Sequence, residues 1–176
     1  MLVCKYIDTP VGKMRMGATD AGICLFDFQY RKSIDTIMSR VENTLGMKAS
    51  EGEHPYFIKL EQQIDEYFKG VRKDFDLPLH LVGSPFQVSV WEGLLQIPYG
   101  ETRSCKKQSI VLGNEKAIRA VASANGENSI AIIVPCHRVI GTNGSLTGYG
   151  GGLPRKKWLL EHEWKHSGRS GQGELF

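Results

Sequence analysis

The feature that most limits how this chain can fold is a run of helix start and stop signals that begins at Ser84. Ser84-Pro85-Phe86-Gln87 combines an N-cap, a proline at the first helical position and a glutamine that can bond back to the cap. Apolar residues then recur at helical spacing until Pro98-Tyr99-Gly100, which ends the helix. The sequence therefore predicts that a new, mainly helical unit starts at Ser84.

Further helices are predicted after this one. The first runs from about Ser104 to Val111, and Gly113-Asn114 then supplies a turn and an N-cap. The second is predicted over Glu115–Ala124 and is closed by Asn125-Gly126. Two short helices joined by a glycine turn are typical of a helix-turn-helix, although many helical hairpins share this pattern. A last helix is predicted from about Pro154 to Lys165.

The first half of the chain predicts strands followed by helices. Val11–Met16 and Ile23–Phe28 are rich in β-forming residues, and Asp20-Ala21-Gly22 between them favours a tight turn, so a β-hairpin is expected. Helices are expected over Arg31–Leu45 and Pro55–Lys69, and a short extended segment over Phe75–Leu81. The fold class is thus α/β of the α+β kind, and no residue of this half is a candidate for chemistry.

These patterns divide the chain into a structural α/β domain at 1–83, a second domain at 84–165 and a glycine- and serine-rich tail at 166–176 that is expected to be disordered. Residues 1–83 carry 11 Lys and Arg against 12 Asp and Glu, a net charge of −1. Residues 84–176 carry 11 against 7, a net charge of +4. The positive excess in the second half favours an anionic partner.

Composition excludes several classes of protein. No apolar run approaches the ~18 residues of a membrane span, and the N-terminus lacks a signal-peptide pattern, so a cytoplasmic protein without membrane contact is expected. Cys4, Cys24 and His80 could approach one another, but no two metal-ligating residues lie close in sequence there, so neither a metal site nor a cofactor is predicted. The four cysteines have no paired spacing and are expected to be reduced: Cys4, Cys24, Cys105 and Cys136.

Pro135-Cys136-His137-Arg138 is the segment that most suggests chemistry. It follows Ile130–Val134, a predicted buried strand, and a nearby base or positive charge can turn a thiol into a nucleophilic thiolate. Adjacent residues of an extended segment point to opposite faces, so His137 is expected to reach the sulfur of Cys136 through a bend or a bridging water. Glu163 on the last helix is the candidate carboxylate that would orient His137. The alternative is that Cys136 is a small buried hydrophobic residue and Glu163 a surface glutamate.

Positive charge is concentrated in Arg103–Arg119, which holds five Lys and Arg and a single acid, Glu115. Such a stretch suits phosphate contacts, but a solvated face would look the same. The helix Glu115–Ala124 also carries small side chains that would let its backbone approach another surface closely, with Arg119 among them: Ala117, Ala120, Ala122, Ser123 and Ala124. Tight packing inside the protein is the alternative interpretation.

Several motifs occur together in the order and spacing of one protein family. They are Pro98–Thr102, Gly113-Asn114 with Ala120-Val121, Pro135–Val139 and Leu159–Glu163. On these motifs the chain resembles the O6-alkylguanine-DNA alkyltransferases, closely over residues 84–165 and more loosely over the first half. The resemblance implies a ribonuclease-H-like domain of strands and helices, followed by a mainly helical domain with a winged-helix-like helix-turn-helix.

The resemblance also implies roles for individual residues. Cys136 would accept the alkyl group from a guanine flipped out of the duplex, His137 would take the thiol proton through a water, and Glu163 would orient His137. Asn128 would order the active-site turn, and Arg119 would fill the space that the flipped base leaves. The other expected contacts are with the DNA (Ser104, Cys105, Ala117, Ala120 and Ala122) and with the extruded guanine (Val139, Tyr149, Gly150 and Gly151). The implied partner is double-stranded DNA carrying O6-alkylguanine, approached from the minor groove by a monomer, and O4-alkylthymine stays open as a second substrate.

One residue departs from the family. A tyrosine that assists base flipping and donates a hydrogen bond to the guanine usually follows the serine at the position of Ser104, and here the residue is Cys105. A thiol is a weaker donor than a phenol and much smaller, so alkyl transfer is expected to persist but to be slower than is usual for the family. Cys105 could also be reactive itself.

The implied function is direct DNA repair by a stoichiometric, self-inactivating transfer to Cys136. The alternative is a protein that binds alkylated DNA without transferring anything, and such a protein would not need a thiol at position 136. A Cys–His hydrolase is the third possibility; it would need an oxyanion site, and nothing in the sequence marks one.

Overall fold

The computed structural model describes residues 1–168, and the chain divides into two compact units. Unit 1 comprises Met1–Ser84 together with Ser129–Ala131, and unit 2 comprises Pro85–Asn128 and the chain from Ile132 onward. Most of the tail expected at 166–176 lies outside the described residues, although its first residue, His166, is helical.

Unit 1 is built on a four-stranded sheet in the order β3-β2-β1-β4, in which the first three strands form an antiparallel meander and β4 pairs in parallel with β1. The predicted hairpin is the pair β2 and β3. Gly22 in its turn has a φ of +149°, and a Cβ there would lie 2.7 Å from the carbonyl oxygen of Pro78, so the turn requires glycine. The strands are β1 (Leu2–Thr9), β2 (Gly12–Thr19), β3 (Gly22–Phe28) and β4 (Ala49–Glu51).

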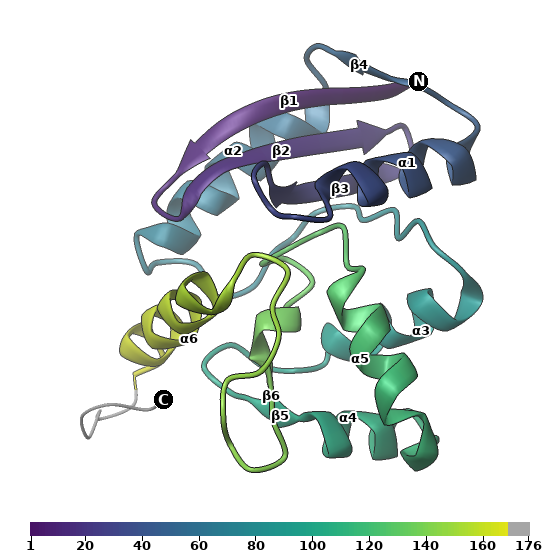
Figure 1. Cartoon of the computed structure of the whole chain (residues 1–176). Helices are drawn as coiled ribbons and strands as arrows, with labels where there is room; N and C mark the ends of the chain where they lie inside the picture. The colour runs from purple at the N-terminus through teal and green to yellow at the C-terminus, as the bar shows by residue number, and fades with distance from the viewer. Residues whose placement is uncertain (169–176) are drawn as a thin grey trace. The chain divides into compact units, whose positions relative to one another are not determined.

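Two helices, α1 (Ile34–Leu45) and α2 (Pro55–Phe68), lie on opposite faces of this sheet (Figure 1). The α1 helix buries Ile37, Met38 and Val41 in a cluster with strand residues that include Leu2 and Cys4. The α2 helix begins at the predicted proline, where Nδ1 of His54 accepts a hydrogen bond from the backbone N–H of Tyr56 at 3.2 Å. Both predicted helices are therefore present.

The α1 helix starts three residues later than predicted because Arg31 is committed to the sheet. Its guanidinium donates to Oδ2 of Asp27 at 2.9 Å, and both side chains are buried. Burial raises the pKa of Asp27 to about 6, although the charge of Arg31 opposes this. The pair joins the end of β3 to the turn that precedes α1.

The predicted strand Ile130–Val134 is wrong. Ile130 alone makes a bridge, to Phe26, and the chain then turns over residues 131–133. Within the described residues Ile132 is the one non-glycine residue with a positive φ, at 70°. All five side chains are buried, and a short apolar run cannot distinguish a strand from a buried turn. The extended segment Phe75–Leu81 likewise makes one bridge, from Leu79 to Ile23.

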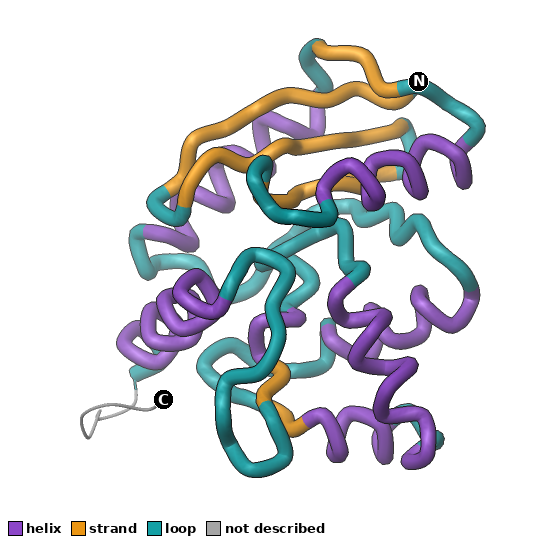
Figure 2. Tube along the Cα trace, viewed as in Figure 1, coloured by secondary structure: helices purple, strands orange, loops and turns teal. Residues whose placement is uncertain are grey.

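Unit 2 consists mainly of helices and loops (Figure 2). The helix-turn-helix departs from prediction at its second helix, since Glu115–Ala117 form a 3-10 turn and the side chain of Asn114 makes no capping bond. The elements are α3 (Pro85–Leu94), β5 (Arg103–Ser104), α4 (Cys105–Val111), α5 (Ile118–Gly126), β6 (Val139–Ile140) and α6 (Leu153–His166). The predicted fold class, α+β with a strand domain first and a helical domain second, is confirmed.

Side-chain hydrogen bonds fix the helices of unit 2 to one another. The indole N–H of Trp91 on α3 donates to the carbonyl oxygen of Ala124 on α5 at 2.8 Å. The amides of Gln108 on α4 and Asn125 on α5 bond reciprocally, both at 2.8 Å. Helices α4 and α5 are therefore held in one arrangement. Within residues 1–168 every helix is too short or too polar to cross a bilayer.

Candidate active site

Cys136, His137 and Arg138 form one turn of 3-10 helix, η2 (Cys136–Arg138), directly after Pro135. The expectation that neighbouring side chains point to opposite faces assumed an extended backbone and does not apply to this turn. Cys136 is half-buried, whereas His137 is fully buried. Cys136 is therefore partly accessible to solvent, while the imidazole of His137 is shielded from it.

Asn128 lies beneath the turn that carries Cys136. Its buried Nδ2 donates to the carbonyl oxygen of Val134 at 2.8 Å and to Sγ of Cys136 at 3.3 Å. Donating to sulfur favours the thiolate over the thiol. The same amide thus fixes the backbone turn and stabilises negative charge on the sulfur.

Glu163 on α6 binds both residues that follow the cysteine. Its Oε2 accepts from Nε2 of His137 at 2.6 Å, and its Oε1 accepts from Nε of Arg138 at 2.7 Å. Burial raises the pKa of the Glu163 carboxyl, but the positive partners outweigh it and hold that pKa well below its usual range. Burial lowers the pKa of His137 and outweighs Glu163, which raises it. The surface-glutamate interpretation of Glu163 is wrong, since its side chain is 1% exposed.

Arg138 is held on two further sides. Its Nη1 donates to the carbonyl oxygen of Ile97 at 2.6 Å, and its guanidinium carbon lies 5.7 Å from the ring centroid of Tyr99. Burial raises the pKa of Tyr99 to about 12, and the nearby Glu163 carboxylate adds to this. Tyr99 is therefore neutral, and the guanidinium faces a carboxylate, a carbonyl and an aromatic ring.

Lys156 is a functional candidate that the sequence analysis missed. Its buried ammonium donates to the carbonyl oxygens of Thr147 at 2.8 Å and Gly148 at 3.3 Å. Burial lowers the pKa of Lys156, and negative charge on Cys136 or Cys105 would raise it, so a positive charge lies within electrostatic reach of both thiols. A signal existed in the sequence, because Lys156 shares the helical spacing of the buried α6 residues Leu159, Leu160 and Glu163.

Cys105 occupies the first position of α4, just after its N-cap Ser104, whose hydroxyl accepts from the N–H of Lys107 at 3.0 Å. The thiol of Cys105 donates to the carbonyl oxygen of Ile140 at 3.2 Å. That carbonyl belongs to β6, which pairs in parallel with β5. The thiol of Cys105 thus adds one hydrogen bond between the start of α4 and β6, next to the backbone pairing of β5 with β6.

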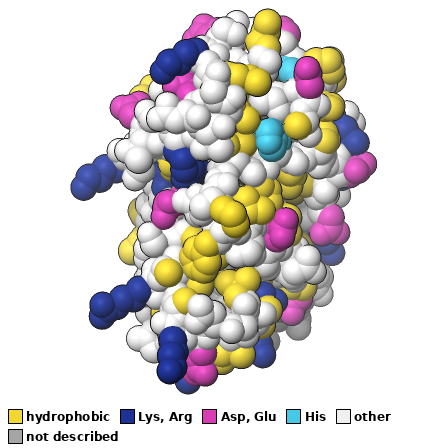
Figure 3. Space-filling model, turned by 90° about the vertical axis from the view of Figure 1, so that its right-hand side faces the viewer, with side chains coloured by type: hydrophobic (Ala, Val, Ile, Leu, Met, Phe, Trp, Pro, Cys, Tyr) yellow, Lys and Arg dark blue, Asp and Glu magenta, His cyan; other side chains and the backbone are white. Residues whose placement is uncertain are grey.

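The residues expected to meet DNA on α5 differ in exposure. Arg119, Ala120 and Ala122 are exposed, Ala117 before the helix is half-buried, and Ala124 is buried against α3. Packing inside the unit therefore accounts for Ala124 but not for Ala120 or Ala122. On the face that Figure 3 shows, basic and acidic side chains are interspersed, so the positive charge there is not gathered into one patch.

The residues expected around the guanine lie in β6 and in the loop before α6. Val139 is buried, and Tyr149 and Gly150 are half-buried. The carbonyl oxygen of Tyr149 accepts from the N–H of Gly152 at 2.9 Å, and that of Gly151 accepts from Arg155 at 3.0 Å. These bonds fix the end of the loop to the start of α6.

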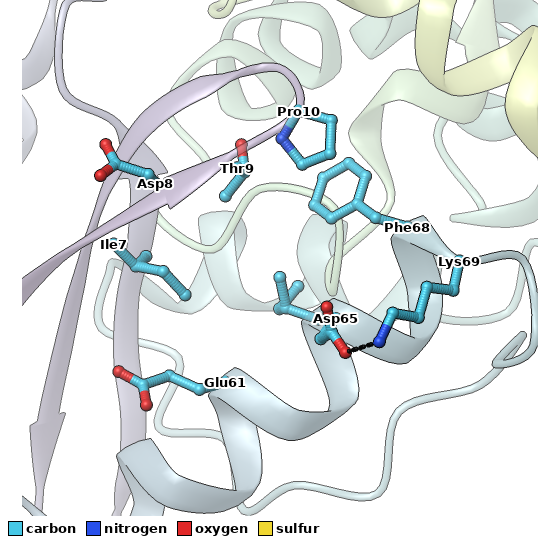
Figure 4. A pocket seen from close by; sticks show the side chains of 9 residues that line it. Ile7, Asp8, Thr9, Pro10, Glu61, Asp65, Phe68 and Lys69 are labelled. Carbon is cyan, nitrogen blue, oxygen red and sulfur yellow. Dashed lines mark ion pairs between the residues drawn. The ribbon is translucent and has the colours of Figure 1, made fainter.

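A cavity of about 250 Å³ lies within unit 1, between the β1–β2 turn and α2 (Figure 4). Its walls include Asp8, Glu61 and Asp65, and Asp65 is paired with Lys69 at 2.7 Å. The lining contains neither cysteine nor histidine, so this cavity has no nucleophile comparable to Cys136. Among residues 1–168, no three His, Cys, Asp or Glu side chains are grouped so that they could hold a metal ion.

Comparisons with known proteins agree with this geometry. Residues 85–165 match the DNA-binding domain, and residues 2–81 the ribonuclease-like domain, of 6-O-methylguanine DNA methyltransferase. A methylated-DNA–protein-cysteine methyltransferase of Methanosarcina barkeri is 40% identical over 158 residues, which cover 89% of this chain and 94% of the relative. The methylated-DNA–protein-cysteine methyltransferase of Mycolicibacterium paratuberculosis is 41% identical over 171 residues, which cover 95% of this chain and 95% of the relative. The crystal structure of Mycobacterium tuberculosis OGT in complex with DNA superposes with a TM-score of 0.79 at 40% identity, covering 93% of this chain and 94% of that one. The chain belongs to the 6-O-methylguanine DNA methyltransferase family.

Proposed function

We propose that this protein repairs DNA directly, by moving the alkyl group of an O6-alkylguanine to Cys136 in a single turnover. The observation that carries the proposal is the arrangement around the sulfur: Asn128 donates to Sγ, and the next residue, His137, is paired with the buried carboxylate of Glu163. A thiol beside an oriented base is the arrangement that activates a cysteine for attack on carbon.

In the reaction, a lone pair of the Cys136 sulfur bonds to the alkyl carbon while the bond from that carbon to guanine O6 breaks. The electron pair of the broken bond stays with the guanine, and the proton that leaves Cys136 passes to His137 and ends on the guanine. The product is a thioether, which offers no easy return to the thiolate, so each molecule reacts once.

We further propose that one copy of the chain meets DNA through α4 and α5, with α5 in the minor groove. Exposed Ala120 and Ala122 would let the α5 backbone approach the groove, and exposed Arg119 would occupy the space of the flipped base. The DNA would also contact Ser104, Cys105 and Ala117. Val139 and the Tyr149–Gly151 loop would receive the guanine.

The direct test is to weigh the intact protein after incubation with a duplex that carries O6-methylguanine. A gain of one methyl mass is expected in the native protein and in Cys105→Ala, and none in Cys136→Ala. An unchanged native mass together with tight binding would instead indicate a protein that recognises alkylated DNA without transfer. The same assay with O4-methylthymine decides whether that base is a second substrate. Within residues 1–168, which include all four cysteines, no disulfide is formed, and this fits a reducing compartment such as the cytoplasm, where we place this reaction.

Replacing Cys105 with tyrosine is expected to raise the single-turnover rate of methyl transfer from duplex DNA. A phenol is a stronger donor than the thiol and reaches farther, so it can help the departing guanine. Lys107→Tyr, two residues along α4, is the matched control and should bring no gain. A Cys105→Tyr protein slower than the native one would contradict the idea that the thiol is the weaker helper.

A further inference from the structure

His137, Arg138 and Glu163 form one buried, hydrogen-bonded group of charged and titratable side chains. The carboxylate of Glu163 carries one negative charge and the guanidinium of Arg138 one positive charge. Arg138 binds Oε1 of this carboxylate, and His137 binds Oε2. Lys156 also acts electrostatically on His137, Tyr99 interacts with Glu163, and Cys136 precedes His137 in the chain. All three paired side chains are buried, at 0% exposed for His137, 8% for Arg138 and 1% for Glu163.

The hydrogen bonds of His137 indicate which of its nitrogens carries the proton. A carboxylate accepts, so Nε2 of His137 must be the donor to Glu163. Among residues 1–168, no side chain or backbone group bonds to the buried Nδ1. No protein acceptor among these residues faces Nδ1 to favour an imidazolium. The arrangement therefore suits a neutral imidazole whose Nδ1 is free to accept a proton.

A buried carboxylate against a histidine would ordinarily favour the imidazolium, because an opposite charge at that distance stabilises it. Here the guanidinium of Arg138 already neutralises the carboxylate. It binds Oε1 with a charge-assisted hydrogen bond and is itself held by the Ile97 carbonyl and the Tyr99 ring. With Arg138 in place, His137 is not needed as a counter-ion.

We propose that Arg138 is a positioning residue that neutralises Glu163 and so keeps His137 as the free base that alkyl transfer requires. The inference rests on the proposed function for its catalytic meaning, but the charge state of His137 can be measured without any reaction. Glu163 and Arg138 then divide the work: the carboxylate orients the imidazole, and the guanidinium prevents that carboxylate from protonating it.

The test is the nitrogen NMR spectrum of the His137 ring as a function of pH, assigned through the signals that vanish in His137→Gln. Native His137 should be neutral and protonated on Nε2 at neutral pH. Arg138→Met should show an imidazolium there, and Arg138→Gln, which keeps an amide donor but no charge, should do the same. Arg138→Lys retains the charge and should behave as the native protein does. The double variant Arg138→Met/Glu163→Gln removes both charges and should restore the neutral ring.

A purely structural role for Arg138 predicts a different outcome, in which lysine, methionine and glutamine disturb the ring equally and the double variant is worse than either single one. Arg72→Met removes an arginine that pairs with Glu66 in unit 1 and should leave the His137 spectrum unchanged. An imidazolium in the native protein at neutral pH, or a neutral ring in both Arg138→Met and Arg138→Gln, would overturn the proposal.

Kinetics separate this inference from the proposed function. At neutral pH, Arg138→Gln should transfer methyl about 10²-fold more slowly than the native protein, the size of effect that loss of a general base brings, and should recover as the pH rises. A native protein that transfers no methyl refutes the proposed function, while the spectrum still decides what Arg138 does. Equal rates and equal pH profiles in the native protein and Arg138→Gln would refute the positioning role alone.

Discussion

Replacing Glu163 with glutamine is expected to slow alkyl transfer by about 10²–10⁴-fold and to lower the free energy of unfolding by about 3–5 kcal/mol. The rate falls because His137 loses the carboxylate that fixes its orientation and its tautomer. Stability falls because Arg138 keeps its positive charge in a buried site where the opposing charge is gone. Single-turnover transfer and denaturant unfolding measure the two effects.

The pH dependence of the stability difference follows from the direction of the Glu163 shift. Its folded pKa lies below the unfolded value of about 4.3, so the carboxylate stabilises the fold at every pH above that value. That stabilisation begins to be lost as the pH falls below about 4, and the loss continues until the pH reaches the folded pKa. The gap in unfolding free energy between native protein and Glu163→Gln should therefore be constant near neutrality and shrink only in acid.

Glu161→Gln is the matched control for this prediction. Glu161 lies on the same helix, is exposed and pairs at 3.8 Å with Lys157. An exposed pair of this kind contributes about 0–1 kcal/mol, so the variant should resemble the native protein in both assays. Native transfer rates in Glu163→Gln would show that His137 does not act through this carboxylate.

Replacing Asn128 with alanine is expected to slow transfer from free O6-methylguanine base about 10–100-fold and to lower the free energy of unfolding by about 1–3 kcal/mol. The kinetic loss comes from the hydrogen bond to Sγ of Cys136, which favours the thiolate. The loss of stability comes from the carbonyl oxygen of Val134, which would lose the side-chain donor that holds the turn. The free base is used so that DNA binding does not enter the measurement.

Asn125→Ala separates the two effects of the Asn128 substitution. Asn125 is three residues away and makes two side-chain hydrogen bonds to Gln108, none of them to the turn that carries Cys136. Its loss should cost a similar amount of stability while leaving the rate with the free base unchanged. If both variants slow the free-base reaction equally, the Asn128 effect is a general loss of structure and not a contact with sulfur.

Local signals in the sequence located the hairpin and the helices, although α1 and α5 each start three residues later than predicted. Helix α4 begins beside Ser104 as predicted, Pro55 starts α2 and Gly22 lies in the β2–β3 turn, because helix starts and positive φ are decided by a few adjacent residues. Strand β1 was missed because Leu2, Val3 and Cys4 are all buried, so the alternation that marks a half-exposed strand is absent there. The turn at Ile132 was misjudged because its geometry depends on long-range bonds that Phe26 makes.

The part of the candidate site that could be predicted from the sequence consists of residues whose type alone suggests a chemical role. Cys136, His137 and Glu163 stood out as a thiol, a base and a carboxylate, and the structure brings the last two into contact. Lys156 was missed despite its helical spacing, and Arg138 was noted only as a basic neighbour of Cys136, because residue type does not show which partner a basic side chain meets. Burial decides their role, and burial is set by the packing of α6 and η2.

Unit 1 includes the three residues Ser129–Ala131, so cutting the chain at a single point does not separate the two units. Phe26 on the edge strand β3 donates its N–H to the Ser129 carbonyl at 2.8 Å, and the N–H of Ala131 donates back to Phe26 at 2.7 Å. A fragment that stops at residue 84 would leave these edge groups of β3 unpaired, and an unpaired edge invites association with other chains. A first-half fragment joined to a foreign domain would therefore need that domain to supply the same backbone pairing to β3.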